Sequence, residues 1–328
     1  MTLTKYILRI KRQAKYSVKT AAYLMGLDRS FFRKATGSRI LVYHGICLRD
    51  HLRFNTIFLT KKIFESHLRF YKKYFNLISL EDYYQRKFDS QRFNICLSFD
   101  DGFANNHKYV LPLLEKYEIP AAFFITAIRD AGFDILWNDC LSIAYKYGPG
   151  KFNLRGREFI KGNGGKYVSA GGESLADILR HADFEDKAEM IELLKPFREK
   201  ANEDYWLQMT EEQVKELSRS KWVTIGSHGY YHNDLAEIPG NSVRNEIAKS
   251  KEFLENITGK KIKALAFPYG SYTKEVIEAA KEIGFTQLLA TEFIFPDDMA
   301  DTTLRERLTI NPFISVINQM HANITGKY

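Results

Sequence analysis

Residues 94–102 read NICLSFDDG, a stretch that predicts a buried strand ending in two carboxylates. The run from Ile95 to Phe99 carries no charge, which is typical of a strand covered on both sides, as in a parallel sheet. Asp100 and Asp101 follow at once. In α/β barrels the reactive groups gather where the parallel strands end. The stretch therefore predicts both a fold class and a place for chemistry.

Similar runs recur along the chain and alternate with helical patterns. We expect the other strands at 39–43, 121–126, 223–226, 263–267, 285–290 and 307–310, and helices at 61–74, 106–117, 211–220, 242–257, 273–283 and 315–325. Thr210 and Gln213 form a capping-box pattern at the start of the 211–220 helix. Seven or so strand–helix units in one chain predict an α/β barrel of about seven parallel strands.

Composition excludes several classes of protein. The 328 residues are 45% hydrophobic and 27% charged, a globular mixture that argues against disordered and fibrous proteins. We expect a basic N-terminal segment at 1–37 and a barrel at 38–328, interrupted by an insertion at about 130–210. Eight of the 20 glycines lie in the insertion between 148 and 172. That part predicts a hairpin or loop, with helices following around 175–200.

The first 39 residues carry the positive charge of the chain. They hold ten Lys or Arg and one acid, a net charge of +9, so the remaining residues sum to −1. A nucleic-acid-binding body would carry its own basic stripe, so we expect no nucleic acid partner. Apolar residues at helical spacing from Leu3 to Met25 predict an amphipathic helix. Such a helix either lies on an anionic membrane surface or packs on the barrel.

Location is predicted from the same segment and from the cysteines. No apolar run near the start is long enough for an export signal or a membrane span. Cys47, Cys96 and Cys140 are too few and too scattered for a disulfide framework. We expect unpaired thiols and a cytoplasmic protein, with peripheral contact at the inner face of the membrane as a further hypothesis.

Two further strand ends carry notable residues. The strand at 223–226 is followed by SHGYYHN, in which His228 and His232 are four residues apart. Two imidazoles at this spacing can share one metal ion. The strand at 263–267 ends in Phe267-Pro268-Tyr269-Gly270, which by itself indicates a tight turn.

The order SFDDG, SHGYYH and FPYG resembles the polysaccharide deacetylases that share the NodB homology domain, carbohydrate esterase family 4. The resemblance covers about 38–312 and is weakest in the insertion. It implies a distorted (β/α) barrel and a metal-dependent removal of acetyl groups from N-acetylated sugars. By the same resemblance Asp101, His228 and His232 hold one divalent ion, Zn²⁺ foremost and Co²⁺ or Ni²⁺ as alternatives. Asp100 is then the general base, and the backbone N–H of Tyr269 binds the oxyanion.

The sequence departs from the family pattern at two places. Ala266 stands where the third motif usually has an arginine that orients the general base, and Arg307 is the candidate replacement. The late Leu-x-His motif is missing, because His321 lies in an expected terminal helix, where we interpret it as a surface residue. The general acid is therefore assigned to His44, since an early Tyr-His pair resembles the circularly rearranged poly-N-acetylglucosamine deacetylases.

The insertion and the third motif supply candidate substrate contacts. Trp137 begins the insertion, where aromatic residues of this family often face the sugar, and the alternative is core packing. Pro268 and Tyr269 are the other candidates. The predicted function is metal-dependent hydrolysis of N-acetyl groups from a polysaccharide or glycan precursor. A deformylase or O-deacetylase using the same site, and a non-catalytic carbohydrate-binding barrel, remain the alternatives.

Overall fold

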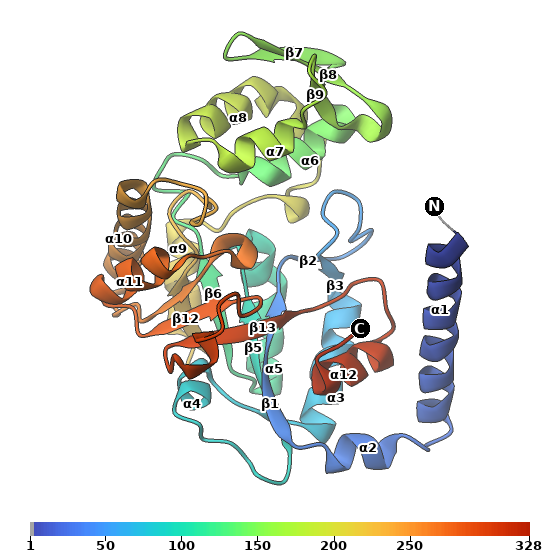
Figure 1. Cartoon of the computed structure of the whole chain (residues 1–328). Helices are drawn as coiled ribbons and strands as arrows, with labels where there is room; N and C mark the ends of the chain where they lie inside the picture. The colour runs from blue at the N-terminus through green and yellow to red at the C-terminus, as the bar shows by residue number, and fades with distance from the viewer. Residues whose placement is uncertain (1–2) are drawn as a thin grey trace.

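A closed ring of seven parallel strands forms the centre of the molecule (Figure 1). This computed structural model describes the backbone of residues 3–328 and the side chains of 14–328. Round the ring the strands are β1 (Gly37–Tyr43), β13 (Leu304–Thr309), β12 (Gln287–Ala290), β11 (Ala264–Ala266), β10 (Val223–Ser227), β6 (Ala121–Ile125) and β5 (Phe93–Phe99). β5 pairs with β1 in parallel along its whole length and closes the barrel. The predicted barrel is confirmed.

Alternate residues of each strand enter two different cores. The inward side chains fill the barrel with a small cluster that includes Ile40, Cys96, Phe124, Ala266 and Leu289. The outward side chains, such as Leu41, Leu97, Phe123, Leu265 and Leu288, join the larger core under the helices. Because both faces of the strands are buried, their sequences carry few charges. Gly226 must stay small, since a Cβ there would meet the Phe124 ring at 2.5 Å.

The helices outside the ring agree closely with the sequence pattern. They are α3 (Lys61–Tyr74), the π-helical turn η1 (Asn106–Val110) with α5 (Leu111–Tyr117), α9 (Glu211–Arg219), α10 (Gly240–Thr258), α11 (Lys274–Glu282) and α12 (Val316–Thr325). The capping box of Thr210 and Gln213 is formed, and Thr60 and Thr273 cap α3 and α11 in the same way through their hydroxyls. These caps satisfy amide groups that the first helical turn leaves free.

Several short elements carry no pattern that a sequence could reveal. They are β2 (Ile46–Cys47), β3 (Leu59–Thr60), β4 (Asn76–Leu77) and α4 (Leu80–Tyr84). β4 adds to the first half of β5, and Leu80 and Tyr83 of α4 join the inner core of the barrel. Segments of two to five residues are too short to show a period, so these elements depend on the barrel around them.

The insertion forms a lobe with its own core above one end of the barrel (Figure 1). It contains α6 (Trp137–Tyr147), the antiparallel strands β7 (Lys151–Leu154), β8 (Arg157–Lys161) and β9 (Tyr167–Ser169), the helices α7 (Leu175–His181) and α8 (Phe184–Arg198), and the 3₁₀ turns η2 (Asn163–Gly165) and η3 (Glu203–Tyr205). Its returning segment bonds to the loop after β5, through Ala104 N to Leu207 O and Met209 N to Gly102 O. This places the lobe over the carboxyl ends of the strands.

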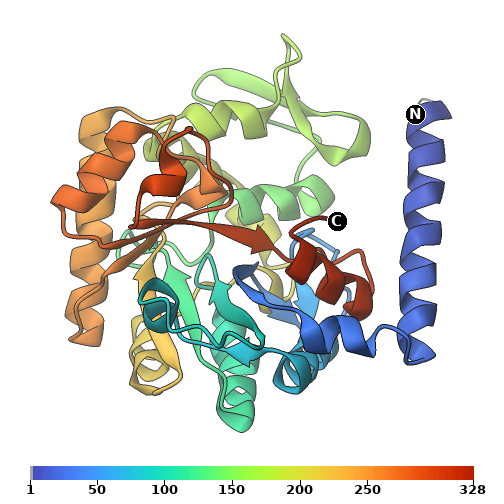
Figure 2. The ribbon, with the colours of Figure 1, turned by 60° about the horizontal axis from the view of Figure 1, so that its bottom comes forward.

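The N-terminal helices lie at the edge of the molecule, as two views agree (Figures 1 and 2). They are α1 (Leu3–Leu24) and α2 (Arg29–Lys34), and α12 is the neighbour of α1. The prediction that His321 is a surface residue is wrong. It is 6% exposed, its Nε2 lies 2.9 Å from Asp28 Oδ2, and its ring stacks on Phe31. Among the helices of the described residues, none combines the length and apolarity that crossing a bilayer requires.

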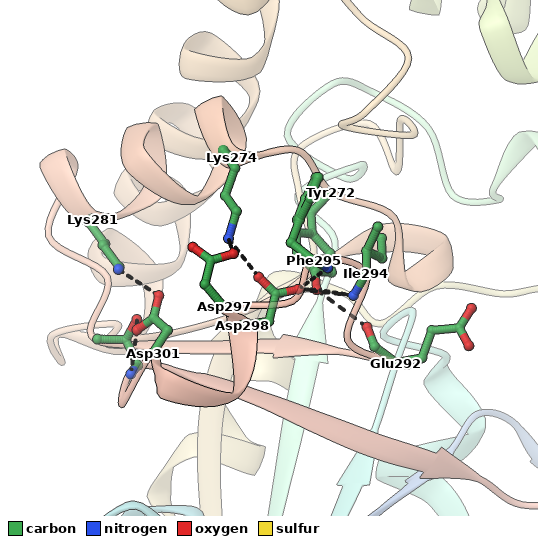
Figure 3. A network of polar contacts seen from close by, with 10 residues as sticks. Tyr272, Lys274, Lys281, Glu292, Ile294, Phe295, Asp297, Asp298 and Asp301 are labelled. Carbon is green, nitrogen blue, oxygen red and sulfur yellow. Dashed lines mark hydrogen bonds and ion pairs between the residues drawn. The ribbon is translucent and has the colours of Figure 1, made fainter.

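A polar network fixes the loop between β12 and β13, which includes the 3₁₀ turn η5 (Asp298–Ala300) (Figure 3). The buried Asp298 accepts hydrogen bonds from the Tyr272 hydroxyl, from the Ile294 and Phe295 amides at 2.9 and 2.8 Å, and from Lys274 at 2.9 Å. Burial alone would raise the pKa of Asp298, but these hydrogen bonds outweigh it and lower the pKa to about 2. The network anchors the start of β13.

Candidate metal and catalytic site

Two strand ends bring the three predicted ligands together. Asp101 follows β5, and His228 and His232 lie in the loop after β10. Their ligand atoms lie within 4.8 Å of one another, and all three residues are buried. Asp101 Oδ1 is 3.4 Å from Nε2 of His228 and 3.2 Å from Nε2 of His232.

The donor set fits a single divalent ion. Nδ1 of His228 lies 2.8 Å from the carbonyl oxygen of Ala266, which can only accept, so Nδ1 carries the proton. Its Nε2 therefore presents a lone pair towards Asp101, the arrangement usual for a metal-binding histidine. One carboxylate and two imidazoles are a common ligand set for Zn²⁺ that leaves coordination positions open for water and substrate.

Asp100 makes a different set of contacts from its neighbour. Nη1 and Nη2 of Arg307 lie 2.8 Å from its Oδ1 and Oδ2, a bidentate ion pair. The Arg307 guanidinium carbon is 5.3 Å from the centre of the Phe124 ring, so this cation lies inside the barrel. Ala266 also points inward and is small. The guanidinium that contacts Asp100 is therefore supplied by Arg307 of β13, and not by an arginine at the position of Ala266 on β11.

Both carboxylates are held in the ionised form. Burial alone would raise the pKa of Asp100, but the charge of Arg307 outweighs it and lowers the pKa. Burial also opposes ionisation of Asp101, yet its contacts with the side chains of His228 and His232 hold its pKa well below the usual value. At neutral pH one carboxylate can ligate an ion while the other accepts a proton.

Three of the site residues have a left-handed backbone. Asp101, His232 and Tyr269 have φ of 75°, 60° and 61°, among seven non-glycine residues with positive φ in the described residues 3–328. This conformation costs free energy for residues with a Cβ and occurs where surrounding structure enforces it. Here it turns side chains of consecutive residues in different directions at the barrel mouth.

His44 and Tyr269 complete the mouth of the barrel. His44 follows β1, next to Asp100, whose amide donates to the Tyr43 carbonyl at 2.9 Å. Burial lowers the pKa of His44, and its Nδ1 has no hydrogen-bond partner among the described residues. The Tyr269 ring is 37% exposed and meets the His232 ring edge-on at 4.9 Å. The guanidinium carbon of Arg180, a residue of the insertion, lies over the same ring, 4.9 Å from its centre.

The structure adds residues that the sequence analysis missed, because they hold the histidine loop from a distance. Glu246 of α10 accepts from the amides of Tyr231 at 2.8 Å and Asn233 at 3.2 Å, and from the Asn233 side chain at 2.9 Å. Lys187 of α8 donates to the Asn233 side-chain oxygen at 2.6 Å. Burial lowers the pKa of Lys187 to about 8. Only the polar Asn233-Asp234 pair after His232 could have signalled this clamp.

A second contact ties α7 to the same loop. Arg180 bonds Asp234 at 2.8 and 2.7 Å. The rings of Phe184 and Tyr231 stack at 4.0 Å. The insertion therefore holds the loop that carries His228 and His232.

Two of the predicted substrate contacts are buried. Trp137 is 4% exposed in the core of the insertion, where the Lys187 ammonium lies 5.6 Å from its ring centre. Pro268 is also buried. Core packing is therefore the better interpretation of Trp137, and Tyr269 is the aromatic residue that the mouth exposes.

Comparison with known proteins shows a similarity to one family. The profile described as "Polysaccharide deacetylase" matches residues 88–135 and 199–288. The two matched segments carry the strand ends after β5, β10 and β11, and the gap between them falls in the insertion. A relative is YxkH of Bacillus subtilis (strain 168), whose name assigns it provisionally to the polysaccharide deacetylases. It is 22% identical over 257 residues, which are 77% of this chain and 64% of YxkH. The chain thus spans less than two thirds of that relative.

Solved structures share the fold. A Streptococcus pyogenes deacetylase, PplD, in complex with acetate has a TM-score of 0.57 at 16% identity, covering 88% of this chain and 98% of its own. A de-N-acetylase from Aggregatibacter actinomycetemcomitans has a TM-score of 0.55 at 18% identity, covering 86% and 99%. IcaB from Ammonifex degensii has a TM-score of 0.51 at 16% identity, covering 89% and 98%.

Proposed function

We propose that the chain belongs to the polysaccharide deacetylase family, hydrolyses N-acetyl groups of an N-acetylated carbohydrate and releases acetate and a free amine. One observation carries the proposal. Asp101, His228 and His232 converge at the barrel mouth, and the adjacent Asp100 is held as a carboxylate by Arg307. A non-catalytic sugar-binding barrel would have no need of this buried set of charges, which is costly to assemble.

The roles follow from what each group touches. Asp101, His228 and His232 would hold one divalent ion, Zn²⁺ foremost, with Co²⁺ or Ni²⁺ as alternatives. Such an ion, when bound, acidifies water and polarises a carbonyl group. Asp100, ionised beside Arg307, accepts the proton of the attacking water. The Tyr269 amide donates to the oxyanion, and His44 gives a proton to the leaving amine, which completes the hydrolysis.

The test is an acetate-release assay on a panel of N-acetylated glycans and lipid-linked sugars. We expect release that stops with a chelator and returns with Zn²⁺ or Co²⁺. Formylated and O-acetylated sugars belong in the same panel, because the attacked carbonyl is similar in all three. A protein that binds metal but releases no acyl group from any member would contradict the proposal.

We also propose the setting of the reaction. The substrate is a glycan precursor, the enzyme works in the cytoplasm, and its other partner is an anionic membrane surface. Cys47, Cys96 and Cys140 are all free and buried, in keeping with a reducing compartment. Fractionation of cells expressing the full chain, followed by a high-salt wash, tests this location. Recovery of the protein outside the cell would contradict it.

A further inference from the structure

The face of α1 that contacts the body is polar and aromatic, not apolar. Asn318 of α12 donates to the Tyr16 carbonyl at 3.2 Å and to the Thr20 hydroxyl at 3.3 Å. Tyr23 packs on Phe32 and Phe70, with ring centres 5.8 and 5.7 Å apart. These positions follow one another at helical spacing and define the inner face of α1.

A second set of residues on α1 forms an apolar stripe that faces away from the body. It consists of Ala14, Val18, Ala21 and Met25, at spacings of four, three and four residues, with Met25 one residue beyond the end of the helix. Because an α-helix has about 3.6 residues per turn, a residue two positions from another lies on nearly the opposite side. Val18 and Met25 are each 68% exposed.

The stripe continues beyond the helix. Leu24 and Leu27 are also exposed apolar side chains next to it. Isolated exposed hydrophobic residues are ordinary, but a contiguous row of them marks an interaction surface. From the sequence pattern alone, one would expect this apolar row to pack against the barrel.

Charge decides which partner fits the row. Lys15 and Lys19 lie along one side of it, and the first 39 residues carry a net charge of +9, while the rest of the chain sums to −1. A second copy of this chain would bring the same positive charge to the contact, so self-association is opposed. A nucleic acid offers negative charge but no apolar layer. A bilayer with anionic headgroups offers both.

We propose that α1 docks the protein on anionic lipid through Ala14, Val18, Ala21 and Met25, with Leu24 and Leu27 beside them. Lys15 and Lys19 reach the headgroups, and the opposite face, Tyr16, Thr20 and Tyr23, holds the barrel. The helix therefore lies flat between membrane and barrel. The inference deepens the proposed peripheral location and is independent of which acyl group the site removes.

The test compares vesicle binding of the full chain and of a double variant, Val18→Asp with Met25→Asp. The probes are vesicles of phosphatidylcholine alone and vesicles with phosphatidylglycerol added. We expect sedimentation with the anionic vesicles only, weakening as NaCl rises from about 0.05 M to about 0.5 M. The double variant should lose at least about tenfold in partitioning, because it can no longer bury the stripe.

Met299→Asp is the matched control, since Met299 is 82% exposed on the loop before β13, and its binding should equal that of the unchanged chain. Acetate release from a soluble glycan is measured in parallel and should be the same in all variants, so that a failed docking surface and a failed activity are told apart. The docking proposal is overturned by equal binding to both vesicles, by undiminished binding of the double variant, or by a dimer in solution that Val18→Asp dissociates.

Discussion

Asp100 and Asp101 are adjacent in the chain, yet they meet entirely different partners. The left-handed backbone of Asp101 turns its carboxylate towards His228 and His232, while Asp100 meets the fork of Arg307 inside the barrel. Each carboxylate is buried beside positive or hydrogen-bond-donating groups, and this compensates the cost of removing its charge from water. The local geometry therefore separates ligand from base.

The ligand assignment predicts a loss of metal. Asp101→Ala, His228→Ala and His232→Ala each remove one of three donors, and we expect each variant to lose most of its bound divalent ion. Metal content after dialysis of the folded proteins measures this, with circular dichroism as the check on folding. Stoichiometric metal in all three variants would contradict the assignment.

The assignment of Asp100 as the general base predicts that its substitution lowers turnover without changing metal binding. Asp100→Asn keeps the side-chain size and the three ligands, so metal content should stay normal while turnover falls at least about 10²-fold. Asp297→Asn is the control, because Asp297 is exposed on the loop before β13, and we expect no change there. Near-normal acetate release by Asp100→Asn would remove Asp100 from the mechanism.

At the scale of elements, the insertion acts on the metal site through α8. Lys187 bonds Asn233 at 2.6 Å, and Glu246 of α10 holds the same residue from the other side. His232, with its left-handed backbone, precedes Asn233 directly. The histidine loop is thus held between an element of the insertion and an element of the barrel.

This clamp predicts that Lys187 is a positioning residue. Lys187→Met keeps the length of the side chain but loses the bond to Asn233, so we expect metal affinity to fall about 10- to 100-fold, the scale of lost outer contacts to metal ligands. Titration with Co²⁺ or Zn²⁺ measures it. Lys195→Met, on the exposed side of the same helix, is the matched control. Unchanged affinity in Lys187→Met, with the fold intact, would show that the clamp does not act on the metal site.

The loop between β12 and β13 gives a prediction about acid stability. The pKa of Asp298 is about 2 in the fold, below the value of about 3.9 for an unfolded chain, so its stabilisation is complete above pH ~4 and is lost as pH falls towards 2. Asp298→Asn should lower the free energy of unfolding by about 1–3 kcal/mol at pH 6, because amide and hydroxyl donors lose a charged acceptor.

Denaturant unfolding at pH 6, 4 and 2.5 measures the effect. The difference between Asp298→Asn and the unchanged protein should shrink between pH 4 and 2.5. A difference that stays constant over this range would mean that Asp298 does not titrate with a lowered pKa.

At the scale of the whole molecule, α1 is a peripheral addition to a barrel that closes without it. The ring closes through β5 and β1, and Phe32 of α2 is the fully buried aromatic residue that joins the N-terminal segment to the main core. Tyr16 and Thr20 of α1 contact α12, and Tyr23 contacts α2.

Deletion of residues 1–26 should therefore leave a folded, active barrel. We expect a fall of a few degrees in Tm, since only a few contacts of α1 are lost, and unchanged acetate release from a soluble glycan. Calorimetry and the acetate assay measure the two effects. Unfolding of the truncated protein, or loss of its activity, would show that the barrel needs α1 and would contradict this prediction.

The amino-acid sequence determined the seven barrel strands, the main helices around them and the two strand ends that carry Asp101, His228 and His232. These features depend on short-range patterns, because a buried strand shows itself within about six residues and a helix within about twelve. Parallel strands end on the same side, so motifs that follow them must meet at one edge. The barrel was accessible on this ground, and the resemblance to the deacetylases added the assignment of the three ligands.

Only the tertiary structure decided the contacts between segments that are distant in the chain. Arg307 meets Asp100 across 207 residues, and Lys187 meets Asn233 from a separate lobe. The orientation of α1 and the burial of His321 against Asp28 belong to the same class. Pairing of this kind leaves no periodic mark in the sequence, since either partner alone resembles any other charged or polar residue. These pairings form only when the barrel closes and close packing brings particular side chains into contact.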